Sequence, residues 1–461
     1  MKHFIKPIGL LFFIGATWQV AAQEIAVSNT EIRKIHYIPE GESFILKNGS
    51  RKFNRALYGT HTGFRVETGD LPEFALYMPG MGGNFKLGIV TKSISKWLTE
   101  SDSISTKYIP GTMLYEIRDS LLQNGVIKIQ VVAHAENEAM ILKVETENIP
   151  ENIELVWVYG GASGKKFSRD GDVGADPESV FYLQPEYCVN NQYILQKDGF
   201  VLHFGSENNK QKTGNNRNIV GYFPKSETKL VEVNPEKNPI ELFQSKVKTL
   251  PVVIGKINLN SKDKLLWKLE NNDAVNPTSQ TQIETEFNDA LQKVKQLRSR
   301  VTLKTPNAYM NALGGALAVA GDAIWESPAY LHGAIAWRMH LNAWRGAYVA
   351  NPLGWHDRAK SHFESYGNSQ VLEPETGSVV LDSSRNFARQ KEVLGTAMFS
   401  RGYISRRPNN NTIAHHYDMN SVFINQLLRG YQWTGDLEFM RKMWPVVKRH
   451  IAWEKRNFDA D

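Results

Sequence analysis

The stretch IETEFNDALQKVKQLRSR, residues 283–300, marks the point where the sequence changes from one periodicity to another. Its apolar residues Phe287, Leu291, Val294 and Leu297 are separated by three or four positions. This spacing places them along one stripe of an amphipathic α-helix. We therefore predict a connecting helix over residues 281–303, with a different class of structure on each side of it.

The residues before this helix are predicted to form a long series of β-strands. Segments such as SFILKNG, FRVETGD, FALYMPG and AMILKVETEN alternate or cluster apolar residues, and most such segments end in Gly, Asn, Asp or Pro. Short apolar runs bounded by turn residues are typical of strands. Their number and spacing favour a large antiparallel β-sandwich over residues 23–280.

The residues after the connecting helix are predicted to be helical throughout. NAYMNALGGALAVAGDAIW and NSVFINQLLRGYQWTG are two of several helical segments that follow one another with no strand-like segment between them. An array of helical hairpins buries one face of each helix against its neighbours and projects loops at one end. We predict an all-α domain over residues 304–461.

The first 22 residues have the pattern of a secretory signal peptide. Lys2 and Lys6 precede a mostly apolar run from Ile8 to Val20, which ends in small residues at Ala22. The run is too short to span a bilayer, and no cysteine follows closely that could carry a lipid anchor. We predict cleavage after Ala22, no membrane anchor, and a periplasmic or secreted protein.

Cysteine content and charge limit the class of protein further. Cys188 is the only cysteine, so the chain forms no internal disulfide and depends on its core for stability. The formal net charge is +6, and removal of Lys2 and Lys6 with the signal peptide leaves 6 − 2 = +4. This charge is spread out, without the Lys/Arg blocks typical of nucleic-acid binding, so that class is excluded. The sequence does not indicate an oligomeric state.

Residues 327–363, SPAYLHGAIAWRMHLNAWRGAYVANPLGWHDRAKSHF, are rich in Trp, Arg and His. Sugars present apolar faces that stack on indole rings, while their hydroxyls and carboxylates bind charged or amide groups. We expect Trp337 to fill space between helices. Asp357 is either a first-turn carboxylate favoured by the helix dipole or a catalytic carboxylate. The residues of this segment expected to contact a substrate are Trp344, Arg345, Trp355, His356 and Arg358.

A second polar cluster, HHYDMN at residues 415–420, precedes a predicted helix. Asp418 and Asn420 are both favoured N-cap types, and one of them is expected to cap the helix. A cap does not explain the other side chains, so we interpret His415, His416, Tyr417 and Asn420 as substrate-binding residues and Asp418 as a catalytic candidate. Adjacent histidines do not share a helix face as in HExxH, and cysteine pairs are absent, which disfavours zinc.

Two other stretches were candidates for cofactor sites. SRDGDVGADPESV, residues 168–180, alternates carboxylates around glycines but lacks the EF-hand spacing, which favours a solvated loop. GGASGKKF resembles a phosphate loop, yet Tyr159 occupies the place of its first glycine and no Ser or Thr follows. The sequence predicts no metal and no cofactor.

Carboxylates are the remaining groups that could carry chemistry. Glycosidic bonds are broken by one carboxylic acid and one carboxylate on opposite sides of the scissile bond. Most carboxylates of a helical domain are surface charges, and the sequence does not give the distance between any two of them. The candidates at loops or helix ends are Glu326, Asp357, Glu373, Glu375, Asp382 and Asp418.

The segment YQWTGDLEFMRKMWPVVKRHIAWEKRNFDAD, residues 431–461, resembles a hairpin of the six-hairpin glycosidases. These (α/α)6-barrel enzymes include α-L-rhamnosidases, glucoamylases and trehalases. The resemblance extends from Lys304 on, and GWHDR is the nearest counterpart of the general-acid region of the rhamnosidases. The residues that carry it in the last hairpin are Trp433, Gly435, Asp436, Trp444, Pro445, Trp453, Asp459 and Asp461.

The resemblance implies a barrel of twelve helices after the β-sandwich and the linker helix, of which residues 304–461 hold roughly half. We therefore expect a partial (α/α)6 barrel and a chain truncated at its C-terminus. The resemblance also implies an exported glycoside hydrolase that inverts the anomeric centre of a poly- or oligosaccharide. Two alternatives remain open, namely a glycan-binding protein without catalysis and a polysaccharide lyase.

Overall fold

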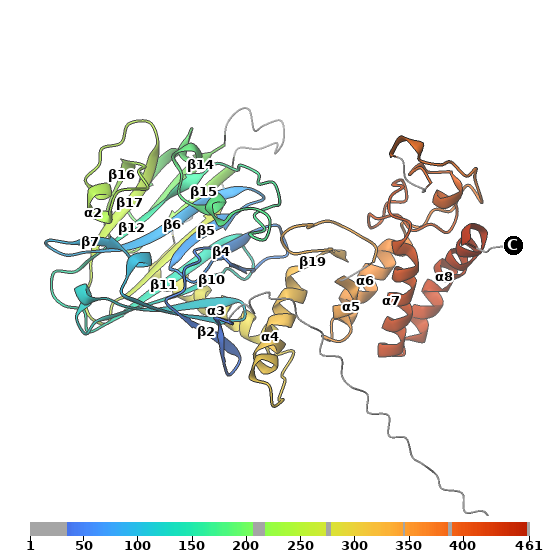
Figure 1. The fold of residues 1–461 in the computed structure, drawn as a ribbon, viewed down its shortest axis with the longest axis horizontal. Coiled ribbons are helices and arrows are strands. Elements are labelled where there is room, and N and C mark those ends of the chain that lie inside the picture. Colours follow the sequence, from blue (N-terminus) through green and yellow to red (C-terminus); the bar gives the residue numbers. More distant parts are fainter. Residues whose placement is uncertain (1–34, 206–216, 273–277, 344–345, 386–389, 459–461) are drawn as a thin grey trace, which may run out of the picture. The chain divides into compact units, whose positions relative to one another are not determined.

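The computed structural model describes residues 35–205, 217–272, 278–343, 346–385 and 390–458. Within these ranges, antiparallel strands occupy the N-terminal part and helices the C-terminal part, which confirms the predicted order of β followed by α (Figure 1). The predicted signal peptide lies outside the described residues. No helix in these ranges is long and apolar enough to cross a membrane.

Among the described residues, the first of two large sheets contains ten strands, and neighbouring strands in it are antiparallel. In spatial order they are β1 (Ile38–Glu40), β2 (Ser43–Lys47), β8 (Ser103–Ile109), β9 (Thr112–Arg118), β10 (Val126–Ala133), β11 (Ala139–Glu147), β18 (Lys264–Asn271), β15 (Arg217–Tyr222), β14 (Gly199–Phe204) and β13 (Gln192–Gln196).

The second sheet contains eight strands and is also antiparallel. In spatial order they are β16 (Glu227–Glu232), β17 (Pro251–Asn258), β12 (Glu154–Ala162), β6 (Met81–Val90), β5 (Glu73–Tyr77), β4 (Arg65–Thr68) and β3 (Arg55–Leu57), with β7 (Ser95–Trp97) paired to β6.

The largest hydrophobic core is formed by inward-facing side chains of both sheets. On β10, Ile127, Ile129 and Val131 are buried in this core at alternate positions, as expected when successive side chains point to opposite faces of a strand. Trp157 of β12 and Trp267 of β18 both pack against Phe85 of β6. The sequence pattern of alternating apolar residues therefore reflects a core between the two sheets.

Helices cover the outer faces of both sheets. The short helix α2 (Pro239–Phe243) packs on the second sheet. Helix α3 (Gln280–Arg298) occupies the stretch where the sequence predicts a connecting helix, and the side chain of Ser279 caps its first turn. Its buried stripe of Ile283, Phe287, Ala290 and Val294 packs on residues of the first sheet.

Much of the remaining chain folds into helices around a second core. The helices are α4 (Ala308–Ala323), α5 (Gly346–Ala350), α6 (His356–Gly367), α7 (Met419–Thr434) and α8 (Leu437–Phe458), and a small hairpin joins β19 (Trp325–Glu326) to β20 (Ala329–Tyr330). Single 3-10 turns are η1 (Leu98–Glu100), η2 (Ser120–Leu122), η3 (Glu178–Phe181), η4 (Pro185–Cys188), η6 (Ser383–Arg385) and η7 (Ala397–Phe399). The prediction that residues 304–461 are helical throughout is wrong, because the described residues between α6 and α7 contain loops and 3-10 turns but no α-helix.

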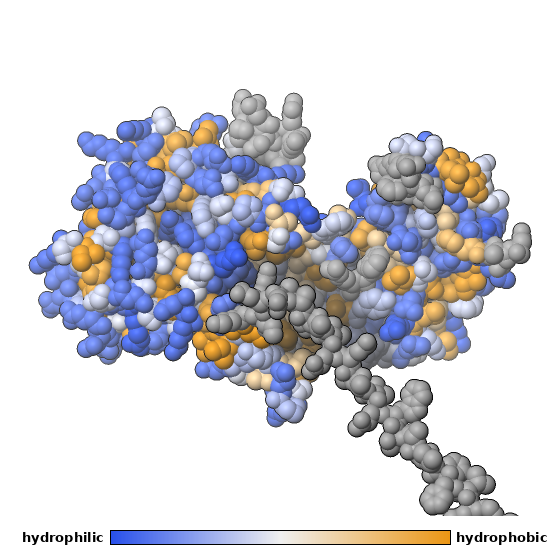
Figure 2. All heavy atoms as spheres, in the orientation of Figure 1, coloured by the Kyte–Doolittle hydropathy of each residue, from blue (hydrophilic) through white to orange (hydrophobic). Residues whose placement is uncertain are grey.

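Helices α7 and α8 form one hairpin. Gly435 takes a left-handed conformation, with φ of 64°, that ends α7, and α8 begins at Leu437. Both helices leave large side chains exposed, including Trp433 of α7 and Trp444 and Ile451 of α8. Figure 2 shows hydrophobic atoms among hydrophilic ones on the face that it draws. Within the described residues, these helices thus bury only part of their apolar surface.

Candidate functional site

Trp337 lies in the irregular loop between β20 and α5 and has an unusual backbone. Its φ is 61°, a left-handed conformation that is rare for a bulky residue, and its side chain is 53% exposed. The expectation that Trp337 fills space between helices is wrong. The residue does not stand on a helix, so no apolar stripe directs its indole ring toward the core.

Two side chains flank the indole ring of Trp337. The guanidinium of Arg169 lies 5.8 Å from its centroid, and the ring of His332 lies 5.9 Å away. The next residue, Arg338, donates to the Glu326 carboxylate at 2.7 Å and to the carbonyl oxygen of Ala323 at 3.2 Å. Arg338 thus ties the exposed loop to the end of α4, and it holds Glu326 beside that loop.

Asp322, in the last turn of α4, forms the most buried ion pair near this loop. Its Oδ1 accepts from Nη1 of Arg358 at 2.8 Å and lies 3.1 Å from Nε2 of His61. Burial alone would raise the pKa of Asp322, but His61 and Arg358 outweigh it and hold that pKa below its usual value. Asp322 is therefore ionised at neutral pH.

The predicted substrate-binding residues at the start of α6 have partners within the protein. Trp355 is buried, and the guanidinium of Arg358 lies 4.6 Å from its ring centroid. His356 lies with Nδ1 2.8 Å from the amide oxygen of Asn351. Asp357 is exposed in the first turn of α6. These contacts give Trp355, His356 and Arg358 a packing role, and their contact with a substrate stays a prediction.

Asp357 lies on a different side of α6 from the buried residues of that helix. It lines an open groove with Lys360, Glu364 and Asn368, whereas His362 and Tyr366 face the core. Asp418 is not among the residues that line this groove. The predicted residues Trp344 and Arg345 lie outside the described residues.

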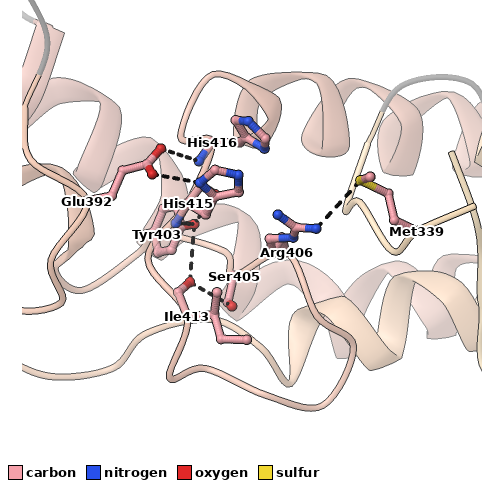
Figure 3. A network of polar contacts seen from close by, with 8 residues as sticks. All are labelled: Met339, Glu392, Tyr403, Ser405, Arg406, Ile413, His415 and His416. Atoms are coloured by element: carbon pink, nitrogen blue, oxygen red, sulfur yellow. Dashed lines mark hydrogen bonds and ion pairs between the residues drawn. The ribbon is translucent and has the colours of Figure 1, made fainter. Parts of the chain in front are cut away.

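The HHYDMN cluster is held by residues from the preceding loop, as Figure 3 shows. Nδ1 of His415 lies 2.7 Å from Oε2 of Glu392. The hydroxyl of Tyr403 accepts from the backbone N–H of His415 at 2.9 Å and donates to its carbonyl oxygen at 2.6 Å. Both the ring and the backbone of His415 are therefore fixed in place.

His416 also has a left-handed backbone, with φ of 56°. Its ring centroid lies 3.5 Å from that of His415, and its backbone N–H donates to Oε1 of Glu392 at 3.4 Å. Burial, and secondly the charge of His415, lower the pKa of the His416 imidazole. His416 is therefore neutral at neutral pH. We name Glu392, Tyr403, Arg406, His415 and His416 the Arg406 cluster.

The other residues of the motif have separate structural roles. Tyr417 packs its ring against Phe399 and Phe458. Asn420 is fully buried, and its amide donates to the carbonyl oxygen of Ile404 and accepts from the backbone N–H of that residue. Its amide therefore fixes the loop in which the Arg406 cluster lies, and contact of Tyr417 or Asn420 with a substrate stays a prediction.

Asp418 is exposed at the N-cap position of α7. Its backbone is helical, and its side chain makes no capping hydrogen bond. The prediction that one of the two residues takes the N-cap position is confirmed for Asp418, but without a side-chain hydrogen bond, and Asn420 bonds to Ile404 instead. The negative charge of Asp418 acts on His416, which places the two residues near each other.

His340 links the loop of Trp337 to the Arg406 cluster. Burial lowers the pKa of His340, Glu326 acts to raise it, and Arg338 and Arg406 act to lower it further. Met339, the preceding residue, contacts Nη2 of Arg406 through its sulfur at 3.6 Å. These contacts connect the loop of Trp337 with the Arg406 cluster. The indole of Trp337, the carboxylates of Asp322 and Glu326, and the pair His415 and His416 are thus parts of one polar region of the helical part.

The structure does not add a metal site to this region. Across the described ranges, no group of three or more His, Cys, Asp or Glu side chains is arranged to hold an ion. In the loop at residues 168–180, Asp176 is buried and accepts from the backbone N–H groups of Arg169 and Gly171. That carboxylate therefore stabilises its own loop.

The residues that sequence reasoning missed are Asp322, Arg338, His340, Glu392, Tyr403 and Arg406. The pair Arg406 and Arg407, nine and eight residues before His415, is a signal in the sequence that could have extended the motif. Asp322 stands at the end of an otherwise apolar helix, and Glu392 is one of many charged residues in its segment. Neither position could be recognised before the chain is folded.

Comparison with known proteins identifies one sequence family. Residues 78–291 match the family model of DUF4450, a domain of unknown function. This range contains most of the strands and part of α3, and it ends before α4 begins. No curated protein matches the sequence.

Two solved structures are similar to parts of the chain. One is a bacterial glucoamylase in complex with acarbose, with 10% sequence identity and a TM-score of 0.45, covering 70% of this chain and 51% of the other. The second is an inverting mannosidase of family GH92 from Bacteroides thetaiotaomicron, with 11% identity and a TM-score of 0.32, covering 61% of this chain and 35% of the other. The chain spans about half the length of the glucoamylase.

Proposed function

We propose that this protein is an exported glycoside hydrolase that acts on a poly- or oligosaccharide. The observation that carries the proposal is Trp337, an indole that is half exposed on a left-handed backbone. Such a conformation costs on the order of 1–3 kcal/mol and persists where the surrounding structure enforces it, as at ligand sites. An exposed indole beside charged groups is suited to stack on a sugar ring.

Carboxylates beside this indole supply the chemistry that hydrolysis requires. Glu326 is paired with Arg338 but is 40% exposed, so water and substrate can reach it. Asp322 is ionised and more buried. An inverting hydrolase uses one carboxylic acid to protonate the leaving oxygen and one carboxylate to activate water. We propose Glu326 for one of these roles and retain Asp357 and Asp418 as further candidates.

The arrangement of the helices as part of an (α/α)6 barrel belongs to the same proposal. It is supported by the hairpin of α7 and α8 and by the sequence resemblance of residues 431–461. Export to the periplasm or the medium is supported by the signal-peptide pattern of residues 1–22. The proposed partner is a carbohydrate, without a metal or cofactor.

The test is an assay of the purified protein against a panel of oligosaccharides, with products separated by chromatography. We expect Trp337→Ala to raise KM at least tenfold, since it removes a stacking surface, and Glu326→Gln to lower kcat. Trp433→Ala, which changes another exposed indole, serves as the matched control and should leave both constants unchanged. Equal activity of Trp337→Ala and the unmodified protein on every substrate would overturn the assignment.

The same panel separates the alternative functions. Tight binding of an oligosaccharide with no product after long incubation would indicate a glycan-binding protein. A lyase breaks the bond by elimination without adding water, so it would release an unsaturated product that absorbs ultraviolet light. Either result would replace the hydrolase proposal.

A further inference from the structure

Arg406 is a half-buried arginine of the helical part, and the described residues offer its guanidinium no carboxylate within ion-pair distance. Arg338 pairs with Glu326, Arg358 with Asp322 and Arg401 with Glu375. Arg406, which is half-buried, has the sulfur of Met339 as its hydrogen-bond acceptor, at 3.6 Å. A thioether is a weak acceptor, whereas a half-buried guanidinium is normally matched by an anion.

The acidic groups nearest to the Arg406 cluster are engaged elsewhere or lie apart from the guanidinium. Both oxygens of Glu392 have partners, one in the ring of His415 and the other in the backbone N–H of His416. Asp418 is exposed and, in the described part of the chain, forms no ion pair with Arg406. Figure 3 shows the guanidinium of Arg406 on the side of the imidazoles opposite Glu392.

Three buried polar atoms without partners among the described residues belong to side chains on which the charge of the same guanidinium acts. The hydroxyl of Tyr366, Nε2 of His340 and Nδ1 of His416 are buried and, among the described residues, lack a hydrogen-bond partner. Arg406 lies near all three, since its charge lowers the pKa of each, although burial is the largest influence on every one. A buried donor or acceptor without a partner costs about 1–3 kcal/mol, so such a group implies a ligand or water that completes it.

We propose that Arg406, Tyr366, His340 and His416 form a subsite for an anionic group on a sugar, either the carboxylate of a uronic acid or a sulfate ester. This inference rests on the proposed carbohydrate function and narrows its substrate class to acidic glycans. Arginine and the tyrosine hydroxyl donate to anionic oxygens, and the neutral imidazoles each offer one N–H and one lone pair to neighbouring hydroxyls. A neutral glycan would leave the guanidinium without an anion.

The test is calorimetric titration of the whole protein with two matched pairs of oligosaccharides. One pair is an oligogalacturonate and its carboxyl-reduced counterpart, and the other is a sulfated galactan oligosaccharide and its desulfated counterpart. We expect one acidic member to bind at least tenfold more tightly than its neutral partner. The pair that shows the difference identifies the carboxylate or the sulfate as the ligand group.

Variants assign the preference to the subsite. Arg406→Met should weaken binding of the acidic member about tenfold to a hundredfold and leave the neutral member unchanged, as expected for loss of charge-assisted hydrogen bonds. Arg429→Met, on the exposed face of α7, is the matched control and should have no effect. Arg406→Lys keeps the positive charge and should retain part of the preference for the acidic member. It therefore distinguishes loss of the charge from loss of the fold.

Two results would overturn the subsite. One is equal affinity for the acidic and neutral members of both pairs. The other is an Arg406→Met variant that folds normally and keeps the full preference. Hydrolysis of a neutral glycan with no effect of Arg406→Met would remove the subsite and leave the hydrolase proposal intact. Tight acidic binding without any product would support the subsite and remove the hydrolase proposal.

Discussion

The carboxylate of Glu392 lies 2.7 Å from Nδ1 of His415, although 22 residues separate them in the sequence. The same carboxylate accepts the backbone N–H of His416, and Tyr403 holds the backbone of His415 on its other side. Two adjacent histidines are thus fixed by residues that no motif connects to them. This arrangement explains why the HHYDMN sequence is kept in one conformation before α7 begins.

Tyr403 should contribute to the stability of this arrangement through its hydroxyl. The ring is buried, and its oxygen makes two hydrogen bonds with the backbone of His415. Tyr403→Phe should lower the free energy of unfolding by about 1–3 kcal/mol, because the backbone groups of His415 lose their partner. Urea denaturation measures this change. Tyr417→Phe is the control, since its hydroxyl makes no hydrogen bond in the described structure, and an equal loss there would contradict the assignment.

Trp337 should be needed for glycan binding but not for the stability of the fold. Trp337→Gly relieves the left-handed backbone of a half-exposed residue, so the free energy of unfolding should stay unchanged or rise by up to about 1 kcal/mol. Glycan binding should be lost at the same time. Trp444→Gly, within α8, should instead destabilise the protein by about 1 kcal/mol because glycine disfavours a helix interior. Thermal unfolding distinguishes the two, and a marked destabilisation by Trp337→Gly would show that its indole is structural.

The ion pairs of Asp322 should stabilise the folded protein. Its side chain is 13% exposed and bonds to both Arg358 and His61. Asp322→Asn should lower the free energy of unfolding by about 2–4 kcal/mol, since it leaves the guanidinium without its anion. Because the pKa of Asp322 is held down in the folded state, this stabilisation is present above about pH 4, the pKa of an unfolded aspartate, and is lost as the pH falls through the folded pKa. An unchanged denaturation midpoint at pH 7 would contradict this role.

Two buried histidines should make the protein sensitive to mild acid. Burial lowers the pKa of His362 to about 3, and burial outweighs a hydrogen bond to the backbone of Gly402 and lowers the pKa of His450 to about 4. The unfolded chain binds a proton at each near pH 6.5 and the folded chain does not, so stability is full above pH 6.5 and falls below it. Each group adds a slope of about 1.4 kcal/mol per pH unit. Urea midpoints between pH 7 and pH 5 measure this slope, and His362→Asn should reduce it.

Asn420 should behave as a structural residue. Its buried amide bonds both the N–H and the carbonyl of Ile404. Asn420→Ala should lower the free energy of unfolding by about 1–3 kcal/mol through two unsatisfied backbone groups. A bound oligosaccharide should not restore the difference. If the variant folds with unchanged stability but loses glycan binding, the amide contacts the substrate directly.

The order of the architecture, with strands before helices, follows from local patterns in the sequence. Alternating apolar residues predict strands because successive side chains of a strand face opposite sides, and the spacing of Phe287 and Val294 predicts the buried stripe of α3. These patterns depend on neighbouring residues alone, so they can be recognised without knowledge of the fold. The position of the HHYDMN motif before α7 could be predicted for the same reason.

Which polar groups meet depends on the folded chain and could not be predicted from local patterns. Trp337 was expected in the core because tryptophan is large and apolar, yet a loop with a left-handed backbone exposes it. The GWHDR motif makes Asp357 a catalytic candidate. In the structure, Asp357 lies on the exposed side of α6, whereas His362 lies on the buried side. Contacts such as Glu392 with His415 depend on long-range packing of loops, and the burial that sets their chemistry exists only when the chain is folded.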